Sequence, residues 1–166
     1  GPVGTAAAVL ASGAGAKVKI ASHSSANRAR MSSQVANARY GATTEPVDAS
    51  SEDNKSAAIA RMDVVMSSAK AGVQILSQQL LKQAVRLLVA ADINAVPPAG
   101  IEGVNLMDDG VPLAAGSGKA VGIGALAIGD IKYQVQHGLF EAMLQAEKPL
   151  YLDFREAFAL ARKYVS

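Results

Sequence analysis

The chain has 166 residues, half of them hydrophobic and 18% charged, with a formal net charge of +2 at neutral pH. This composition is typical of a globular domain with a sizeable core and excludes an intrinsically disordered chain. The 16 basic residues are scattered and aromatic residues make up only 4%, which disfavours nucleic acid as a partner. No apolar run approaches the ~20 residues that span a bilayer, and cysteine is absent. We therefore expect a cytoplasmic protein without disulfides, thiolate catalysis or cysteine-ligated metals.

The first predicted element is a small-residue helix over residues 2–14, which begins at Gly1-Pro2-Val3-Gly4. These four residues resemble the second half of the dinucleotide-binding fingerprint G-x-G-x-x-G. In that motif a bare helix start lets a pyrophosphate approach the free amides, and the helix dipole favours its negative charge. An ordinary Ala-rich helix after a glycine turn would give the same pattern. On the fingerprint interpretation the first glycine and the first strand are missing, and we expect the chain to be a fragment of a larger protein.

Strand and helix patterns alternate along the rest of the chain. The predicted strands cover residues 16–21, 43–48 (a weak strand broken by Pro46), 63–67, 87–92 and 120–123. The predicted helices cover residues 25–39, a stretch up to residue 60, and residues 74–85, 125–147 and 152–164. Residues 95–119 are rich in Pro and Gly and are predicted to be loop, with a turn at 108–110. The alternation predicts an α/β fold: a doubly wound parallel sheet of Rossmann type with helices on both faces and its first strand missing.

Ligands of doubly wound sheets bind at the carboxyl ends of the strands. We therefore expect several polar or small residues to lie at the same edge as the glycine-rich helix start. They are Ser22, His23, Ser24, Ser67, Ser68, Ala69 and Asn94.

The loop after residues 16–21 usually selects the nicotinamide cofactor, because a carboxylate there binds the ribose hydroxyls of NAD and repels a 2′-phosphate. Here the loop is Ser22-His23-Ser24-Ser25, with Arg28 and Arg30 shortly after, and it contains no carboxylate. These residues favour NADP over NAD. The alternative is a solvated turn in which Ser24 or Ser25 merely caps the following helix.

Other polar residues carry weaker signals. His137 is predicted to lie in the middle of a helix, where a lone histidine is more often a surface or packing residue than a catalyst. Asp108 and Asp109 are most simply turn residues, and two adjacent aspartates without histidine do not make a metal site. Glu141 and Glu147 fall on the exposed face of a helix. The sequence thus predicts neither a metal site nor a nucleophile.

Two composite segments are more specific. Residues 91–103 read A-D-I-N-A-V-P-P-A-G-I-E-G, and residues 118–132 read G-K-A-V-G-I-G-A-L-A-I-G-D-I-K. The first predicts a rigid loop at a strand end, and the glycines of the second would let a flat ligand lie against the backbone. Together with G-P-V-G, these segments resemble the NAD(P)-dependent methylene-tetrahydromethanopterin dehydrogenases of one-carbon metabolism, in order and over essentially the whole chain.

The resemblance implies an enzyme that passes hydride from a methylene-pterin to NADP or NAD. It divides the chain into an NAD(P)-binding domain over residues 1–148 and a closing helical segment over 149–166, which would pack toward a missing N-terminal pterin domain. It also assigns roles to residues. The pyrophosphate would bind at Gly1, Pro2, Val3 and Gly4, and the adenosine ribose would face Ser22, His23 and Ser24. Further along the cofactor site, the lining residues would be Ser67, Ser68, Ala69 and Asn94. The nicotinamide would approach Gly124 and Ala125, and Lys132 would lie on the substrate side.

One departure from the family concerns the cofactor. NADP-specific relatives can carry an Arg-Lys pair where this chain has His23-Ser24, so use of NAD is also open. The alternatives for function are a methylene-tetrahydrofolate dehydrogenase, a shikimate-type dehydrogenase, and a non-catalytic nucleotide-binding module. We further expect a small-molecule substrate, a homo-oligomeric assembly, and only marginal stability for these 166 residues alone.

Overall fold

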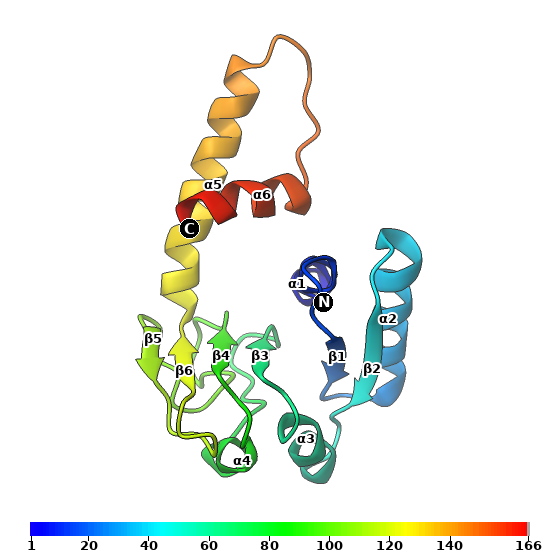
Figure 1. Ribbon diagram of the computed structural model, residues 1–166, viewed down its shortest axis with the longest axis vertical. Coiled ribbons are helices and arrows are strands. Elements are labelled where there is room, and N and C mark those ends of the chain that lie inside the picture. The colour runs from blue at the N-terminus through cyan, green and yellow to red at the C-terminus, as the bar shows by residue number, and fades with distance from the viewer. Residues whose placement is uncertain (166) are drawn as a thin grey trace.

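The strands form two separate sheets in the computed structural model, which describes residues 1–165 (Figure 1). In the first sheet, β1 (Val18–Ser22) pairs in parallel with β2 (Thr44–Asp48). The second has the order β3-β4-β6-β5. Its strands are β3 (Val64–Ser67), β4 (Val89–Asp92), β5 (Asp109–Pro112) and β6 (Val121–Ile123). The pairs β3-β4 and β4-β6 are parallel, and β5 is antiparallel to β6.

Helices lie on both sides of the strands, which confirms the predicted α/β class. Figure 1 shows α1 (Pro2–Gly13), α5 (Ala125–Gln145) and α6 (Phe154–Tyr164) above the strands. Below the strands lie α3 (Glu52–Ile59) and α4 (Gln78–Gln83), and α2 (Ala26–Tyr40) flanks β1 and β2. Among the described residues, none of these helices is long and apolar enough to cross a bilayer.

The caps of α2 show why its predicted ends were close to the observed ones. Ser25 precedes the helix, and its Oγ accepts a hydrogen bond from the amide of Arg28. Gly41 follows it with a φ of 67°, a left-handed conformation that glycine adopts without the steric cost of a Cβ atom. Pro46 does not break β2, because β2 is an edge strand. Its nitrogen points away from β1, where no ladder bond is lost.

Two predicted elements need correction. The helix expected over residues 74–85 covers only Gln78–Gln83, because Ser77 caps it. The segment before it is extended instead: the amides of Ile75 and Leu76 both donate to Gly100 O, and Leu76 bridges to Ile101. Second, the predicted loop at 95–119 contains β5, whose pairing with β6 makes this part of the sheet antiparallel.

Most of the large buried side chains pack around the four-stranded sheet. Leu80 and Leu81 of α4 meet Leu87, Ile101 and Ile59 in one cluster. Leu81, Leu87 and Ile101 are completely buried. This cluster fills the face of the sheet that α3 and α4 cover, so it fixes the positions of β3 and β4 and of the loops at their ends.

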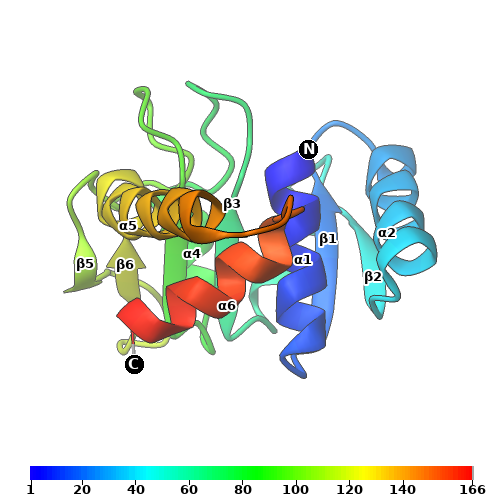
Figure 2. The ribbon, with the colours of Figure 1, turned by 90° about the horizontal axis from the view of Figure 1, so that it is seen from above.

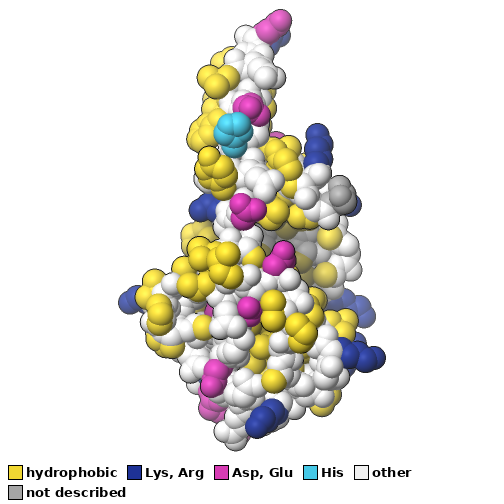
Figure 3. All heavy atoms as spheres, turned by 90° about the vertical axis from the view of Figure 1, so that its left-hand side faces the viewer, with side chains coloured by type: hydrophobic (Ala, Val, Ile, Leu, Met, Phe, Trp, Pro, Cys, Tyr) yellow, Lys and Arg dark blue, Asp and Glu magenta, His cyan; other side chains and the backbone are white. Residues whose placement is uncertain are grey.

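Helix α5 extends 21 residues and stands clear of the sheets over its second half (Figures 1 and 3). Figure 3 shows apolar side chains gathered along it, and Tyr133, Phe140 and Leu144 are among the exposed ones. The chain then turns back into α6, which packs on α5 and contacts α1 (Figure 2).

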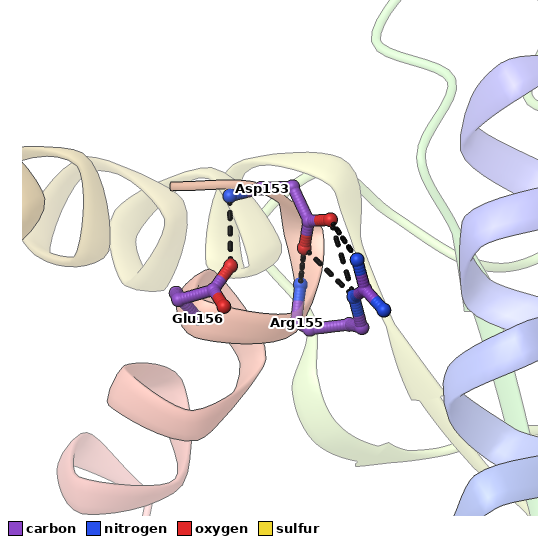
Figure 4. Close-up of polar contacts among 3 residues, drawn as sticks. All are labelled: Asp153, Arg155 and Glu156. Atoms are coloured by element: carbon purple, nitrogen blue, oxygen red, sulfur yellow. Dashed lines mark hydrogen bonds and ion pairs between the residues drawn. The ribbon is translucent and has the colours of Figure 1, made fainter. Parts of the chain in front are cut away.

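The first turn of α6 is held by a complete capping box (Figure 4). The amide of Asp153 donates to Glu156 Oε2 at 2.8 Å, and Asp153 Oδ1 accepts from the amide of Arg155 at 2.8 Å. The guanidinium of Arg155 also pairs with Asp153 at 2.6 Å. These bonds with Arg155 hold the pKa of the Asp153 carboxyl well below its usual range.

Candidate functional site at the carboxyl edge of the strands

The start of α1 is open to a ligand. Gly1 is the N-cap residue and offers no side chain to cap the helix. The first bond within the helix runs from Thr5 N to Gly1 O at 3.0 Å, so the amides of Val3 and Gly4 precede the hydrogen-bond ladder and have no acceptor in the helix. Val3 is 55% exposed. Free amides and the positive end of the helix dipole together suit a phosphate group.

A glycine contact places this helix start beside the carboxyl end of β3. A Cβ added to Gly4 would lie 2.5 Å from Ser68 Oγ, and Ser68 directly follows β3. Helix α1 turns through residues 14–17 into β1 and packs on it, so the two run in opposite directions. The carboxyl end of β1 therefore returns to the start of α1, as Figure 2 shows for the loop beside the N-terminus.

The loop after β1 leaves hydroxyl groups at this edge. Ser22 Oγ and Ser24 Oγ lie 3.0 Å apart, and the amide of Ser24 also donates to Ser22 Oγ. His23 is exposed. The capping alternative applies to Ser25, which uses its hydroxyl at the start of α2. Ser22 and Ser24 are therefore not needed as caps of α2.

Sequence reasoning missed a carboxylate at the same place. Asp48 ends β2 and is the direct neighbour of Ser22 in the parallel register. Its Oδ1 accepts a hydrogen bond from the amide of Ser50 at 3.0 Å, and hydrogen bonding by Ser50 lowers the pKa of Asp48. The signal was available, since an aspartate that ends a parallel strand must lie at the carboxyl edge.

The predicted cofactor-lining residues after β3 differ in accessibility. Ser67 is completely buried, and its Oγ has no hydrogen-bond partner among the described residues. A Cβ added to Gly100 would run into this Oγ and into the carboxylate of Asp92. The side chain of Ser67 therefore points into the protein, whereas Ser68 and Ala69 are partly exposed.

Asn94 holds two loops of this edge together. Its Oδ1 accepts from the amide of Val96 at 3.0 Å and from the amide of Gly72, in the loop after β3, at 3.4 Å. Its Nδ2 donates to Pro98 O at 2.9 Å. Asn94 is 6% exposed. Its side chain is committed to the shape of the edge, a role that its position at a strand end did not reveal.

Asp92, the last residue of β4, fixes both ends of the loop that follows this strand. It is 2% exposed, and its two carboxylate oxygens accept from the amides of Asn94 and Ile101 at 3.1 and 3.0 Å. The carboxylate thus replaces backbone acceptors at both ends of the loop, which satisfies amides that would otherwise be buried without partners. This explains the Asp-x-Asn pattern of the segment in structural terms.

The structure gives Gly124 a packing reason. A Cβ added there would overlap the backbone of Asn105 and Leu106, so glycine is required whether or not a ligand binds. Gly124 is the N-cap of α5, and Ala125 follows it in the first turn, partly exposed. Lys132 is exposed on α5 and makes no ion pair among the described residues.

Other polar residues do not join this edge. His137 lies on the exposed part of α5, 3.7 Å from Glu141. Asp108 is nearly buried and accepts from the amide of Asn105 at 2.8 Å. Across residues 1–165, no cluster of three or more potential metal ligands is found.

A hollow of about 460 Å³ lies away from this edge, where α6 passes the last turns of α1 and α2. Tyr40, Phe158, Arg155 and Arg162 contribute to its walls. The C-terminal ends of α1 and α2 there carry partial negative charge, and Arg155 is paired with Asp153.

Comparison with known proteins identifies two relatives of this chain, both from Methylorubrum extorquens. An NAD(P)-dependent methylenetetrahydromethanopterin dehydrogenase is 44% identical over 161 residues, which are 97% of this chain and 54% of the relative. The bifunctional protein MdtA is 24% identical over 137 residues, or 82% of this chain and 46% of the relative. No family model matches the chain. The chain spans about half the length of the curated relatives it matches.

The first alignment extends over 161 of the 166 residues of the chain. The resemblance to the NAD(P)-dependent methylene-tetrahydromethanopterin dehydrogenase family, which the sequence motifs predicted, is therefore confirmed.

Proposed function

We propose that these residues form the cofactor-binding part of an enzyme that transfers hydride from methylene-tetrahydromethanopterin to NADP or NAD. Residues 1–148 would bind the cofactor, and residues 149–166 would close the domain against a separate pterin-binding part. The observation that carries the proposal is the open start of α1, placed by the Gly4–Ser68 contact at the carboxyl ends of β1 and β3. The name of the 44% identical relative supports the reaction.

The residues present fit a dinucleotide. The free amides of Val3 and Gly4 would bind the pyrophosphate, and Gly1 leaves open space beside them. Ser22, His23 and Ser24 would face the adenosine ribose. When bound, the nicotinamide supplies the hydride acceptor.

The substrate chemistry asks little of side chains. The methylene carbon lies between two nitrogens, whose lone pairs stabilise the cation left when hydride departs, so no proton is removed at that carbon. The protein's contribution would be to hold the two reacting carbons in contact, an orientation effect worth up to about 7–11 kcal/mol in favourable systems. Ala125 would border the nicotinamide, and Lys132 would face the pterin.

We also propose dual cofactor use with a preference for NADP. Hydroxyl groups of Ser22 and Ser24 favour a 2′-phosphate, but Asp48 stands beside Ser22. An aspartate is ionised at neutral pH, and hydrogen bonding by Ser50 lowers the pKa of Asp48 further, so its carboxylate would repel that phosphate. Asp48→Asn should therefore raise the ratio of kcat/KM for NADP to that for NAD. Glu45→Gln, on the same strand but far from the carboxyl edge, should leave the ratio unchanged. A ratio that Asp48→Asn does not move would remove Asp48 from cofactor selection.

The reaction itself is tested with the chain joined to the part of its relative that it does not span. Cofactor reduction should be rapid with methylene-tetrahydromethanopterin and much slower with methylene-tetrahydrofolate. Ala125→Trp should abolish hydride transfer while leaving cofactor binding, measured by calorimetry, intact. Reduction with the folate substrate alone would instead support a methylene-tetrahydrofolate dehydrogenase. Cofactor binding without turnover of either pterin would favour a shikimate-type enzyme or a non-catalytic module.

A further inference from the structure

We propose that Lys70 is a further cofactor-binding residue, whose ammonium group binds the pyrophosphate of the dinucleotide. Lys70 would act together with the open start of α1, so its role rests on the proposed function. It is the third residue after β3, whose last residue is Ser67. Because β3 ends at the edge where α1 begins, Lys70 belongs to the loops of this edge.

The backbone on either side of Lys70 is anchored to neighbouring elements. On one side, Ser68 lies against the start of α1, since a Cβ added to Gly4 would be 2.5 Å from Ser68 Oγ. On the other side, the amide of Gly72 donates to Asn94 Oδ1 at 3.4 Å. Two residues of chain span at most about 7 Å, so Lys70 lies close to Ser68 and to the start of α1.

Lys70 is also the first residue of a tight turn. Its carbonyl oxygen accepts a hydrogen bond from the amide of Val73 at 3.1 Å. Gly72 has a φ of 74°, and no residue other than glycine has a positive φ in the described part of the chain, which together indicate a type II turn. The turn fixes the backbone of Lys70. Its side chain is exposed and carries the ammonium group on a flexible four-carbon stem, so it can reach a ligand at this edge.

Lys70 is the only charged residue in the segments that directly follow β3, β4 and β6. These segments span residues 68–77, 93–100 and 124–129. None of the ion pairs found within the described residues includes Lys70. Its positive charge is therefore available to an anionic ligand.

Two carboxylates of the neighbouring segments have other partners. Glu102 Oε2 accepts a hydrogen bond from the amide of Gln78 at 2.7 Å, at the start of α4. Asp48 accepts from the amide of Ser50 and belongs to β2, which lies on the far side of β1 from β3 (Figure 1). Neither arrangement provides a counter-ion for Lys70.

The charge of the ligand gives Lys70 its role. The pyrophosphate of a dinucleotide carries about two negative charges, whereas the positive end of a helix dipole is equivalent to about half a unit charge. The free amides of Val3 and Gly4 therefore leave most of the ligand's charge unbalanced. A lysine ammonium binds phosphate as a point charge, so Lys70 would supply positive charge that the helix lacks. NAD and NADP share the pyrophosphate, so Lys70 should strengthen the binding of both cofactors equally.

The experiment uses the chain joined to the part of its relative that it does not span, and compares Lys70→Gln with Lys82→Gln. Lys82 is exposed on α4, below the strands (Figure 1), and its substitution removes the same charge. The first probe is ADP-ribose, which contains the pyrophosphate, and the second is adenosine 2′-monophosphate, which does not. At low salt, Lys70→Gln should raise the Kd of ADP-ribose about fivefold and leave that of adenosine 2′-monophosphate unchanged.

Three further measurements sharpen the test. The Kd values of NAD and NADP should rise by the same factor in Lys70→Gln, whereas Asp48→Asn changes their ratio. The effect of Lys70→Gln should shrink in about 1 M salt, which screens exposed charges. Lys70→Arg should restore most of the affinity, and Lys82→Gln should bind every probe like the unsubstituted protein.

Three results would overturn the assignment of Lys70. Lys70→Gln could bind ADP-ribose as tightly as the unsubstituted protein at low salt. It could weaken both probes to the same extent, which would indicate a general effect of net charge. It could raise the KM of the pterin while leaving ADP-ribose binding unchanged, which would assign Lys70 to the substrate. If the unsubstituted protein bound neither ADP-ribose nor the cofactors, the proposed function itself would be wrong.

Discussion

The two sheets differ in the size of the apolar side chains that are buried against them. Around the four-stranded sheet, leucine and isoleucine side chains form one continuous apolar cluster. Around the two-stranded sheet, the buried apolar residues are alanines: Ala8, Ala29, Ala36 and Ala49. Burial of apolar area stabilises in proportion to its size, so the part that carries the candidate pyrophosphate site has the weaker core.

A polar network takes part of the place of large side chains in the two-stranded part. Ser33 Oγ lies 2.9 Å from Thr44 Oγ1 and donates to Thr44 O at 2.8 Å, and Asn37 accepts from the amide of Thr44 at 2.9 Å. Such bonds specify how α2 sits on β2, but each contributes only about 0.5–1.5 kcal/mol. In the two-stranded part, hydrogen bonds fix how α2 packs on β2. In the four-stranded part, burial of large apolar side chains supplies most of the free energy of folding.

The largest expected effect tests the leucine cluster. Leu81→Ala should lower the free energy of unfolding by about 2–5 kcal/mol, because Leu81 is completely buried and leaves a cavity. Ser33→Ala, in the two-stranded part, should cost only about 0.5–1.5 kcal/mol. Urea denaturation of both variants measures the contrast. Equal losses would show that the two parts are stabilised alike and would break the comparison.

A smaller effect is expected at the entrance to α5. Gly124→Ala places a Cβ against the backbone of Asn105 and Leu106, and such overpacking should cost about 1–3 kcal/mol. Gly129→Ala lies in the same helix with open space around it and should stabilise by about 0.5–1 kcal/mol. Thermal unfolding distinguishes them by opposite shifts of Tm. A neutral Gly124→Ala would mean that the 105–106 segment yields easily.

The smallest expected effect concerns the capping box of α6. Bonding to Arg155 lowers the pKa of Asp153. The ionised Asp153 carboxylate therefore stabilises the fold at any pH above the ordinary aspartate pKa, and this contribution is lost as the pH falls through the lowered pKa of Asp153. NMR titration should show the Asp153 carboxyl protonating well below a free aspartate. Arg155→Ala should move its pKa upward, and Lys163→Ala, at the other end of α6, should not. An unchanged value in Arg155→Ala would remove the ion pair as the cause.

Periodicity and capping residues were sufficient to predict most elements of the fold. The ends of α2, predicted at residues 25–39, agree with the capping residues Ser25 and Gly41 that the structure shows. The extended segment around Leu76 could not be predicted from the sequence. Its apolar residues have helical spacing, but Leu76 instead forms a β-bridge with Ile101, which is distant in the sequence. β5 was missed for the same reason: a Gly- and Pro-rich strand forms only because β6 offers an edge.

The candidate site was predictable in its location and less so in its roles. Parallel topology placed Ser22, Ser68 and Asn94 at one edge, but sequence alone gave no sign that Ser67 points inward. Asp48 was overlooked because the prediction considered only the loop after β1. The neighbouring strand β2 places Asp48 directly beside Ser22. Side-chain direction depends on packing, which a single sequence does not display.

The hydrogen bonds of Asn94 have a consequence for motion. One amide side chain connects the loop after β3, through Gly72, to the loop after β4, through Val96 and Pro98. The two loops are thus coupled by a residue that belongs to only one of them. A ligand that displaced Ser68 or Ala69 would shift both loops together, so this edge should respond to binding as a single unit.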